Sequence, residues 1–200
     1  MAGLQYMRLP IDVRKERMTT MKSLLRSGAV IGAMLLSIPA LALDGLEELS
    51  VTEKVNIAAP AEQVWKRVIG FDGTDAWIPG ITKNELVSGE ANQPGAVRKL
   101  YVDEASVTEE LASIDQEKMT LQYRITKENV DLLPVTHYSS TISVVANGAN
   151  DSEVTWSGNF YRGFPESNPP EYLTDEAAVK GVTGLYQAGL NHLKEEMEAK

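Results

Sequence analysis

Between residues 98 and 160, charged and aromatic residues lie an even number of positions from apolar residues of the same segments. The residues expected to face a core from extended segments are Leu100, Val107, Leu111, Leu121, Ile125 and Val154. Side chains of a β-strand alternate between its two faces, so positions separated by an even number share a face. The further residues assigned to the inward face are Arg98, Glu109, Tyr123, Tyr138, Trp156 and Phe160. An interior surface with an arginine, a glutamate and tyrosine hydroxyls is therefore predicted.

Arg98 and Glu109 allow three interpretations. An unpaired buried charge is unfavourable, so the two side chains are expected to pair with each other or to hold a polar group of a ligand. In the first interpretation the pair only shapes the sheet, and in the second it orients a ligand. In the third the site is catalytic, with Glu109 as a general base and Tyr123 or Arg98 stabilising an enolate oxygen.

The chain has three tryptophans, and two of them are twelve residues apart. Trp65 shares one face of a short predicted helix with Ala61, Val64 and Val68, so it is expected to pack in the core. Core packing is also the simplest expectation for Trp156, although its inward position makes it a ligand-binding candidate. Trp77 precedes a Pro-Gly turn, and loop aromatics commonly border openings. We therefore expect Trp77 near the mouth of a pocket.

The elements that position these residues follow from periodicity and turn residues. Strands are predicted at about 50–57, 81–87, 96–102, 106–114, 119–126, 135–145 and 153–161. One short helix ends near Gly70, a second short helical connection precedes Pro79, and a long helix starts near Thr174. Strands and helices segregate in this way in an α+β domain, where an antiparallel sheet curls around the closing helix.

A family resemblance supports this order of elements. The stretches that carry it are Ile57–Trp65 (IAAPAEQVW), Trp77–Gly80 (WIPG), Gly95–Arg98, Glu109–Leu111, Leu121–Ile125, Leu133–Ser140 and Val154–Phe160. They resemble the SRPBCC superfamily, which includes START domains, the birch-pollen allergen and the polyketide cyclase/dehydrase family. Within that superfamily the chain looks most like the exported bacterial branch, which includes an accessory protein of periplasmic methanol oxidation.

The resemblance implies a helix-grip fold with a seven-stranded sheet and an internal cavity for a small hydrophobic ligand, lipid-like or aromatic. It implies no single activity, because members include carriers, cyclases and hydrolases. Related bacterial sequences often have Trp-His-Pro where this chain has Trp77-Ile78-Pro79. The missing histidine favours binding over catalysis.

The N-terminal 42 residues are predicted to be an extended N-terminus and a cleavable signal peptide. Lys22 and Arg26 precede an apolar run that ends in small residues, with a cut expected after Ala42. The run is too short to span a membrane, so residues 43–200 are expected as one soluble periplasmic domain without stable membrane insertion.

Charge and composition limit the classes of partner and cofactor that the chain can bind. Six of the 19 basic and two of the 28 acidic residues precede the expected cut, which leaves 13 basic and 26 acidic residues. Such a chain repels nucleic acid but suits a basic periplasmic redox protein as a partner. Besides ligand binding and catalysis, an acidic interaction module is therefore a further hypothesis for its function. There is no cysteine, and the two histidines, His137 and His192, lack metal-ligand spacing, so neither a metal nor a cofactor is predicted.

Overall fold

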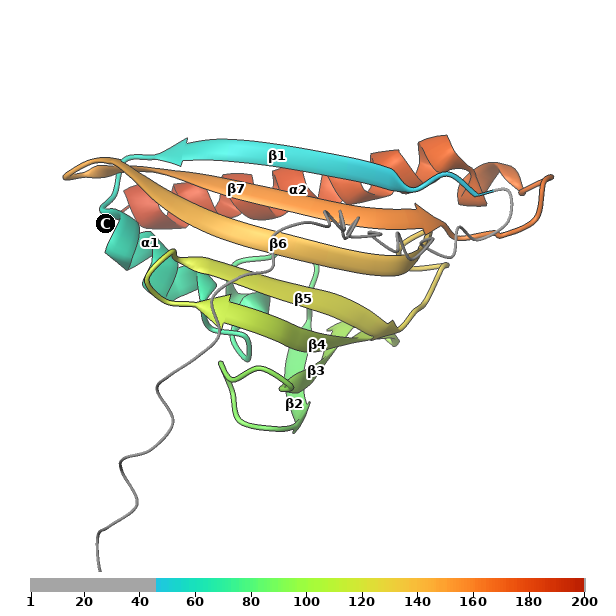
Figure 1. The fold of residues 1–200 in the computed structure, drawn as a ribbon, viewed down its shortest axis with the longest axis horizontal. Helices are drawn as coiled ribbons and strands as arrows, with labels where there is room; N and C mark the ends of the chain where they lie inside the picture. The colour runs from blue at the N-terminus through green and yellow to red at the C-terminus, as the bar shows by residue number, and fades with distance from the viewer. Residues whose placement is uncertain (1–45, 200) are drawn as a thin grey trace, which may run out of the picture. The chain divides into compact units, whose positions relative to one another are not determined.

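Seven strands form one antiparallel sheet in the computed structural model, which describes residues 46–199 (Figure 1). The spatial order is β1-β7-β6-β5-β4-β3-β2. The strands are β1 (Leu49–Ile57), β2 (Lys83–Ser88), β3 (Val97–Val102), β4 (Ala105–Asp115), β5 (Thr120–Lys127), β6 (Val135–Gly148) and β7 (Asp151–Arg162). The predicted fold class and strand count are confirmed. The predicted signal peptide and its cut lie outside the described residues.

The long helix α2 (Asp175–Glu198) packs against one face of the sheet, behind β1 and β7 in Figure 1. Thr174 caps it, because its hydroxyl accepts a hydrogen bond from the backbone N–H of Ala177 at 3.2 Å. Its buried face comprises Ala178, Val182, Tyr186, Gly189, Leu190, Leu193 and Met197. The helix therefore closes the core with one apolar face, whose residues recur every three or four positions. Within residues 46–199, no helix has the length and apolar character needed to cross a membrane.

Two short helices connect β1 to β2. Helix α1 (Ala61–Val68) begins after Pro60, which suits a first turn, and buries Ala61, Val64, Trp65 and Val68. The expected core position of Trp65 is confirmed, and its indole N–H also donates to Gln116 at 3.0 Å. The 3-10 helix η1 (Thr74–Ala76) follows and directs the chain back toward the sheet.

A β-bulge in β6 sets which side chains face inward. The register against β7 shifts between Thr136 and Ser139, and His137 adopts a positive φ of 51°. Val135 and Tyr138 are consequently both buried, although strict alternation would place them on opposite faces. From Tyr138 onward the period of two resumes.

Glycines on α2 and β7 let large side chains approach closely. A Cβ built at Gly189 would lie 2.8 Å from the Trp156 ring, and one at Gly181 would lie 3.1 Å from Pro134. A Cβ at Gly158 of β7 would overlap the Tyr186 hydroxyl. Gly181 and Gly189 are therefore points of close contact on the helix, whereas nothing lies within 4 Å of a Cβ at Gly184.

Candidate functional site

A cavity of about 220 Å³ lies between the sheet and α2. Its walls come from strands β3 to β7, from the β5–β6 loop, from the segment before β2 and from α2. The lining residues are Ile78, Ile81, Arg98, Leu100, Val102, Val107, Glu109, Tyr123, Ile125, Leu132, Leu133, Pro134, Tyr138, Trp156, Gly181 and Leu185. Most of this wall is apolar, as in typical small-molecule sites.

Arg98 and Glu109 form a buried ion pair at this cavity. They are directly opposite each other in the antiparallel pairing of β3 and β4. The Arg98 Nε–H donates to Glu109 Oε2 at 2.8 Å, and Nη2 lies 2.6 Å from the same oxygen. The two side chains are only 5% and 7% exposed. The predicted pairing is therefore confirmed.

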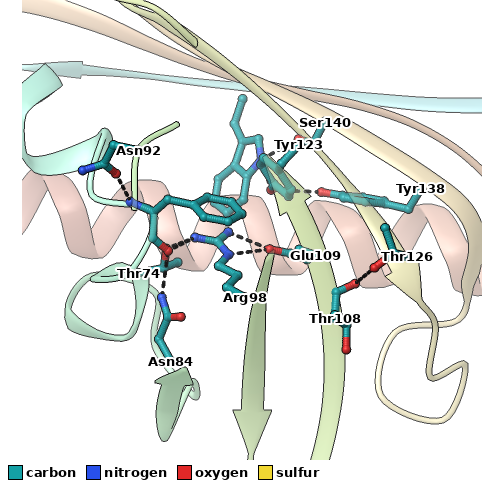
Figure 2. A network of polar contacts seen from close by, with 12 residues as sticks. Thr74, Asn84, Asn92, Arg98, Thr108, Glu109, Tyr123, Thr126, Tyr138 and Ser140 are labelled. Atoms are coloured by element: carbon teal, nitrogen blue, oxygen red, sulfur yellow. Dashed lines mark hydrogen bonds and ion pairs between the residues drawn. The ribbon is translucent and has the colours of Figure 1, made fainter. Parts of the chain in front are cut away.

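Arg98 also anchors the segment between α1 and β2 (Figure 2). Its Nη1 donates to the Phe71 carbonyl at 2.8 Å and to the Thr74 hydroxyl, and its guanidinium lies 4.0 Å from the centre of the Phe71 ring. Asn92 accepts from the Phe71 N–H, and Asn84 donates to the Phe71 carbonyl. The pair thus has a structural role, whatever else it does.

The ion pair retains unused hydrogen-bonding capacity toward the cavity. Both contacts that Arg98 makes with Glu109 are to Oε2, and Oε1 has no hydrogen-bond partner among residues 46–199. A guanidinium carries five N–H groups. Nη2 has two of them but contacts only Oε2 within the described chain, so one N–H remains. The pair can offer a ligand one acceptor and one donor.

A network of buried hydroxyl groups forms the next part of the site. The Trp156 indole N–H donates to Tyr123 at 3.0 Å and to Ser140 at 2.8 Å. The Tyr138 hydroxyl lies 2.6 Å from that of Tyr186 and 3.4 Å from that of Tyr123. Ser140 also contacts the Tyr186 hydroxyl at 3.1 Å, and the Tyr186 ring stacks on Trp156. The network fixes the aromatic wall of the cavity.

Burial sets the acidity of these tyrosines. Loss of solvent, together with the nearby Glu109 carboxylate, raises the pKa of Tyr123 to about 12. Burial likewise raises the pKa of Tyr138 and of Tyr186. The three hydroxyls therefore stay protonated at neutral pH, where they act as neutral hydrogen-bonding groups and not as bases.

Alkaline pH is expected to destabilise the fold through Tyr123. Between the ordinary tyrosine pKa near 10 and the folded value of about 12, the unfolded chain releases a proton that the folded chain keeps. The free energy of unfolding should therefore fall as pH rises through this window, by about 1.4 kcal/mol per pH unit from this residue. Denaturant titrations at pH 9, 10 and 11 would measure the fall.

Two variants separate Tyr123 from other titrating groups. Tyr123→Phe should make the fall with pH shallower by the share of this residue and leave the share of Tyr138 and Tyr186, whose pKa values are also raised. Tyr172→Phe is the control and should leave the fall unchanged, because that side chain is 60% exposed. An equal slope in the wild type and in Tyr123→Phe would contradict the account.

The structure brings five of the six predicted site residues together and excludes one from the cavity. Arg98, Glu109, Tyr123, Tyr138 and Trp156 all line it. Trp77 does not. The expectation that Trp77 borders the mouth is wrong, because η1 turns the chain inward and the ring is only 2% exposed, packed 5.5 Å from Trp156. Its neighbour Ile78 lines the cavity instead.

Sequence reasoning missed several contributors to the site. Ser140 lies two residues after Tyr138 in β6, so the period of two could have identified it. Tyr186 lies on the buried face of α2, and helical spacing gives no sign of the contacts that its hydroxyl makes. The β5–β6 loop residues Leu132, Leu133 and Pro134 gave no periodic signal, since they belong to no strand or helix.

These groups suit ligand binding better than proton transfer. One oxygen of Glu109 is occupied by Arg98, and the tyrosines are neutral. Catalysis by Glu109 would have to use Oε1 alone. Among the described residues, no group of three histidine, cysteine, aspartate or glutamate side chains is placed to hold a metal ion.

The arrangement of a curved sheet and a long C-terminal helix is matched in known proteins. A family model described as "Polyketide cyclase / dehydrase and lipid transport" matches residues 48–198. The chain belongs to this family. No curated protein matches the chain in sequence.

Solved structures of the same architecture agree with membership of the polyketide cyclase/dehydrase family. The chain is 30% identical to an uncharacterised protein from Bacillus thuringiensis, with a TM-score of 0.62 over 74% of this chain and 98% of the other. It is 31% identical to the protein XoxI from Bacillus cereus, also with a TM-score of 0.62, over 74% and 94%.

The Zhui aromatase/cyclase from Streptomyces sp. R1128 is 21% identical, with a TM-score of 0.60 over 76% of this chain and 94% of the other. At this identity the likeness shows the shared fold alone.

Proposed function

We propose that the protein is a binding or accessory protein that takes up one small hydrophobic molecule in the cavity between the sheet and α2. The observation that carries the proposal is the cavity itself, whose wall is apolar apart from the ion pair of Arg98 and Glu109 and the hydroxyls of Tyr123 and Tyr138. Apolar pockets with a few convergent polar groups are typical ligand sites. The family description, which includes lipid transport, supports the same class of function.

We also propose that the protein acts in the periplasm. The basic residues, apolar run and small-residue pattern before Leu43 support export. A basic periplasmic protein remains the proposed macromolecular partner, since the chain carries a formal charge of −9. Capture of such a partner should weaken as salt is raised.

Uptake of a neutral apolar fluorescent dye tests the binding proposal. The wild-type protein should bind the dye in a saturable manner, with one molecule per chain. Ile125→Trp, which adds bulk to the cavity wall, should lower the affinity by about tenfold or more because the dye and the new ring compete for one space.

The matched control adds the same ring elsewhere. Val145→Trp changes a residue of β6 that is 54% exposed and does not line the cavity, so dye binding should stay at the wild-type level. Equal loss of binding in both variants, or no saturable uptake by the wild type, would refute cavity binding.

A cyclase or dehydratase activity is the second candidate. Glu109 lines the cavity, and its Oε1 has no partner among the described residues, so one oxygen can accept a proton from a bound substrate. In this case Glu109→Gln should abolish turnover even at substrate concentrations that saturate the site.

A further inference from the structure

We infer that the ligand is an uncharged molecule of one or two rings that carries a hydroxyl group, such as a phenol or an aromatic alcohol. The inference rests on the proposed binding in the cavity and specifies the chemistry of what is bound. Three observations carry it: the volume of the cavity, the balance of charge on its wall, and the hydrogen-bonding groups left over by the ion pair.

The volume limits the size of the ligand. The cavity measures about 220 Å³. A cavity of about 150 Å³ is known to hold benzene, and sites for drug-sized molecules begin near 300 Å³. The space therefore suits one ring with substituents or two fused rings. A long acyl chain or a two-chain lipid exceeds it.

The charge on the wall disfavours an ionic ligand. Arg98 and Glu109 are the charged side chains among the described residues that line the cavity, and their formal charges cancel. A ligand carboxylate would be desolvated beside Glu109 Oε1 without a net counter-charge, which is strongly unfavourable. A ligand ammonium would meet the same difficulty beside the Arg98 guanidinium.

The unused groups of the ion pair match a hydroxyl. Glu109 Oε1 can accept a hydrogen bond and Arg98 Nη2 can donate one, and a hydroxyl does both at a single oxygen. The Arg98 guanidinium lies 5.4 Å from the centre of the Tyr123 ring. Tyr123, Trp156 and Tyr138 all line the cavity. A ring that presents its hydroxyl to the ion pair would therefore lie among aromatic side chains, where ring contacts add stability.

Three compounds with the same two fused rings test the inference on the wild-type protein. They are naphthalene, 2-naphthol and 2-naphthoate, and binding is measured at pH 7 by calorimetry or by tryptophan fluorescence. We expect 2-naphthol to bind about tenfold or more tightly than naphthalene, since hydrogen bonds to charged groups contribute at least this factor. We expect 2-naphthoate to bind more weakly than both.

Variants assign the selectivity to the ion pair. Glu109→Gln leaves the Arg98 charge without a counter-charge, so binding of 2-naphthoate should strengthen by about tenfold or more while that of 2-naphthol weakens. Glu110→Gln is the matched control, because Glu110 is the next residue of β4 and pairs with the exposed side chain of Arg124. It should leave all three affinities unchanged.

The outcomes separate this inference from the proposed function. If naphthalene or 2-naphthoate binds the wild type as tightly as 2-naphthol, the inference is overturned and the cavity remains a ligand site of other chemistry. If none of the three binds, cavity binding itself fails. The wild-type comparison decides both points even if Glu109→Gln does not fold.

Discussion

Replacing Arg98 with methionine should lower the free energy of unfolding by about 3–5 kcal/mol, the largest effect expected of any single change to the site. The substitution leaves the Glu109 carboxylate buried beside an apolar side chain, since both partners are less than one-tenth exposed. It also removes the donor to the Phe71 carbonyl and the Thr74 hydroxyl. Urea denaturation followed by circular dichroism would measure the loss.

Two comparisons show that burial of the charge causes this loss. Arg124→Met breaks an ion pair of the same residue types on the exposed face, where Arg124 is 58% exposed, and should change stability by less than about 1 kcal/mol. The double variant Arg98→Met/Glu109→Met should recover a large part of the loss, because no unpaired charge remains. Losses of similar size from Arg98→Met and Arg124→Met would show that the buried pair has no special role.

Replacing Gly158 with alanine is expected to lower stability by about 1–3 kcal/mol. The new methyl group would overlap the Tyr186 hydroxyl and would lie 3.2 Å from the backbone carbonyl of Ser139. Relief of this overlap requires Tyr186 to leave its contacts with Tyr138 and Ser140. Thermal or urea denaturation of the variant would give the size of the effect.

A double-mutant cycle identifies the overlap with Tyr186 as the cause. Tyr186→Phe removes the hydroxyl that the new methyl group meets, so Gly158→Ala should be less destabilising in that background than in the wild type. Gly148→Ala is the control, since nothing lies within 4 Å of a Cβ at that position, and its effect should stay within about 0.5 kcal/mol. Additive effects of Gly158→Ala and Tyr186→Phe would argue against the contact.

The pairing of Arg98 with Glu109 could be predicted from the sequence because it depends on local regularity. Val102 pairs with Ala105 across a two-residue turn, and the register of that hairpin brings Arg98 opposite Glu109. An apolar alternation on both strands then places both side chains inward. The register of a tight hairpin depends on residues close in the sequence, so it can be predicted without knowing the rest of the fold.

The position of Trp77 could not be predicted in the same way. It follows a 3-10 helix, and its burial depends on Trp156 from β7 and on Gly189 from α2, which are distant in the sequence. Loop residues carry no periodicity that distinguishes a buried ring from one at an opening. The bulge at His137, which lets Val135 and Tyr138 both face inward, gave no sequence signal either.

Only part of the hydroxyl network could be predicted from the sequence. Tyr123 and Tyr138 follow from strand alternation, but the contact of Tyr138 with Tyr186 depends on how α2 is rotated against the sheet. Helical spacing shows that Tyr186 lies on the buried face and does not show which strand residue its hydroxyl meets. Tertiary packing decides this point.

An NMR titration of methyl groups with 2-naphthol tests the central claim, that the cavity between the sheet and α2 is a ligand site. The account predicts saturable shifts for the methyl groups of Leu100, Val107, Ile125 and Leu133, which line the cavity, and none for the exposed Val87 and Val145. Shifts confined to the exposed methyl groups, or the absence of saturable shifts at the cavity, would contradict it.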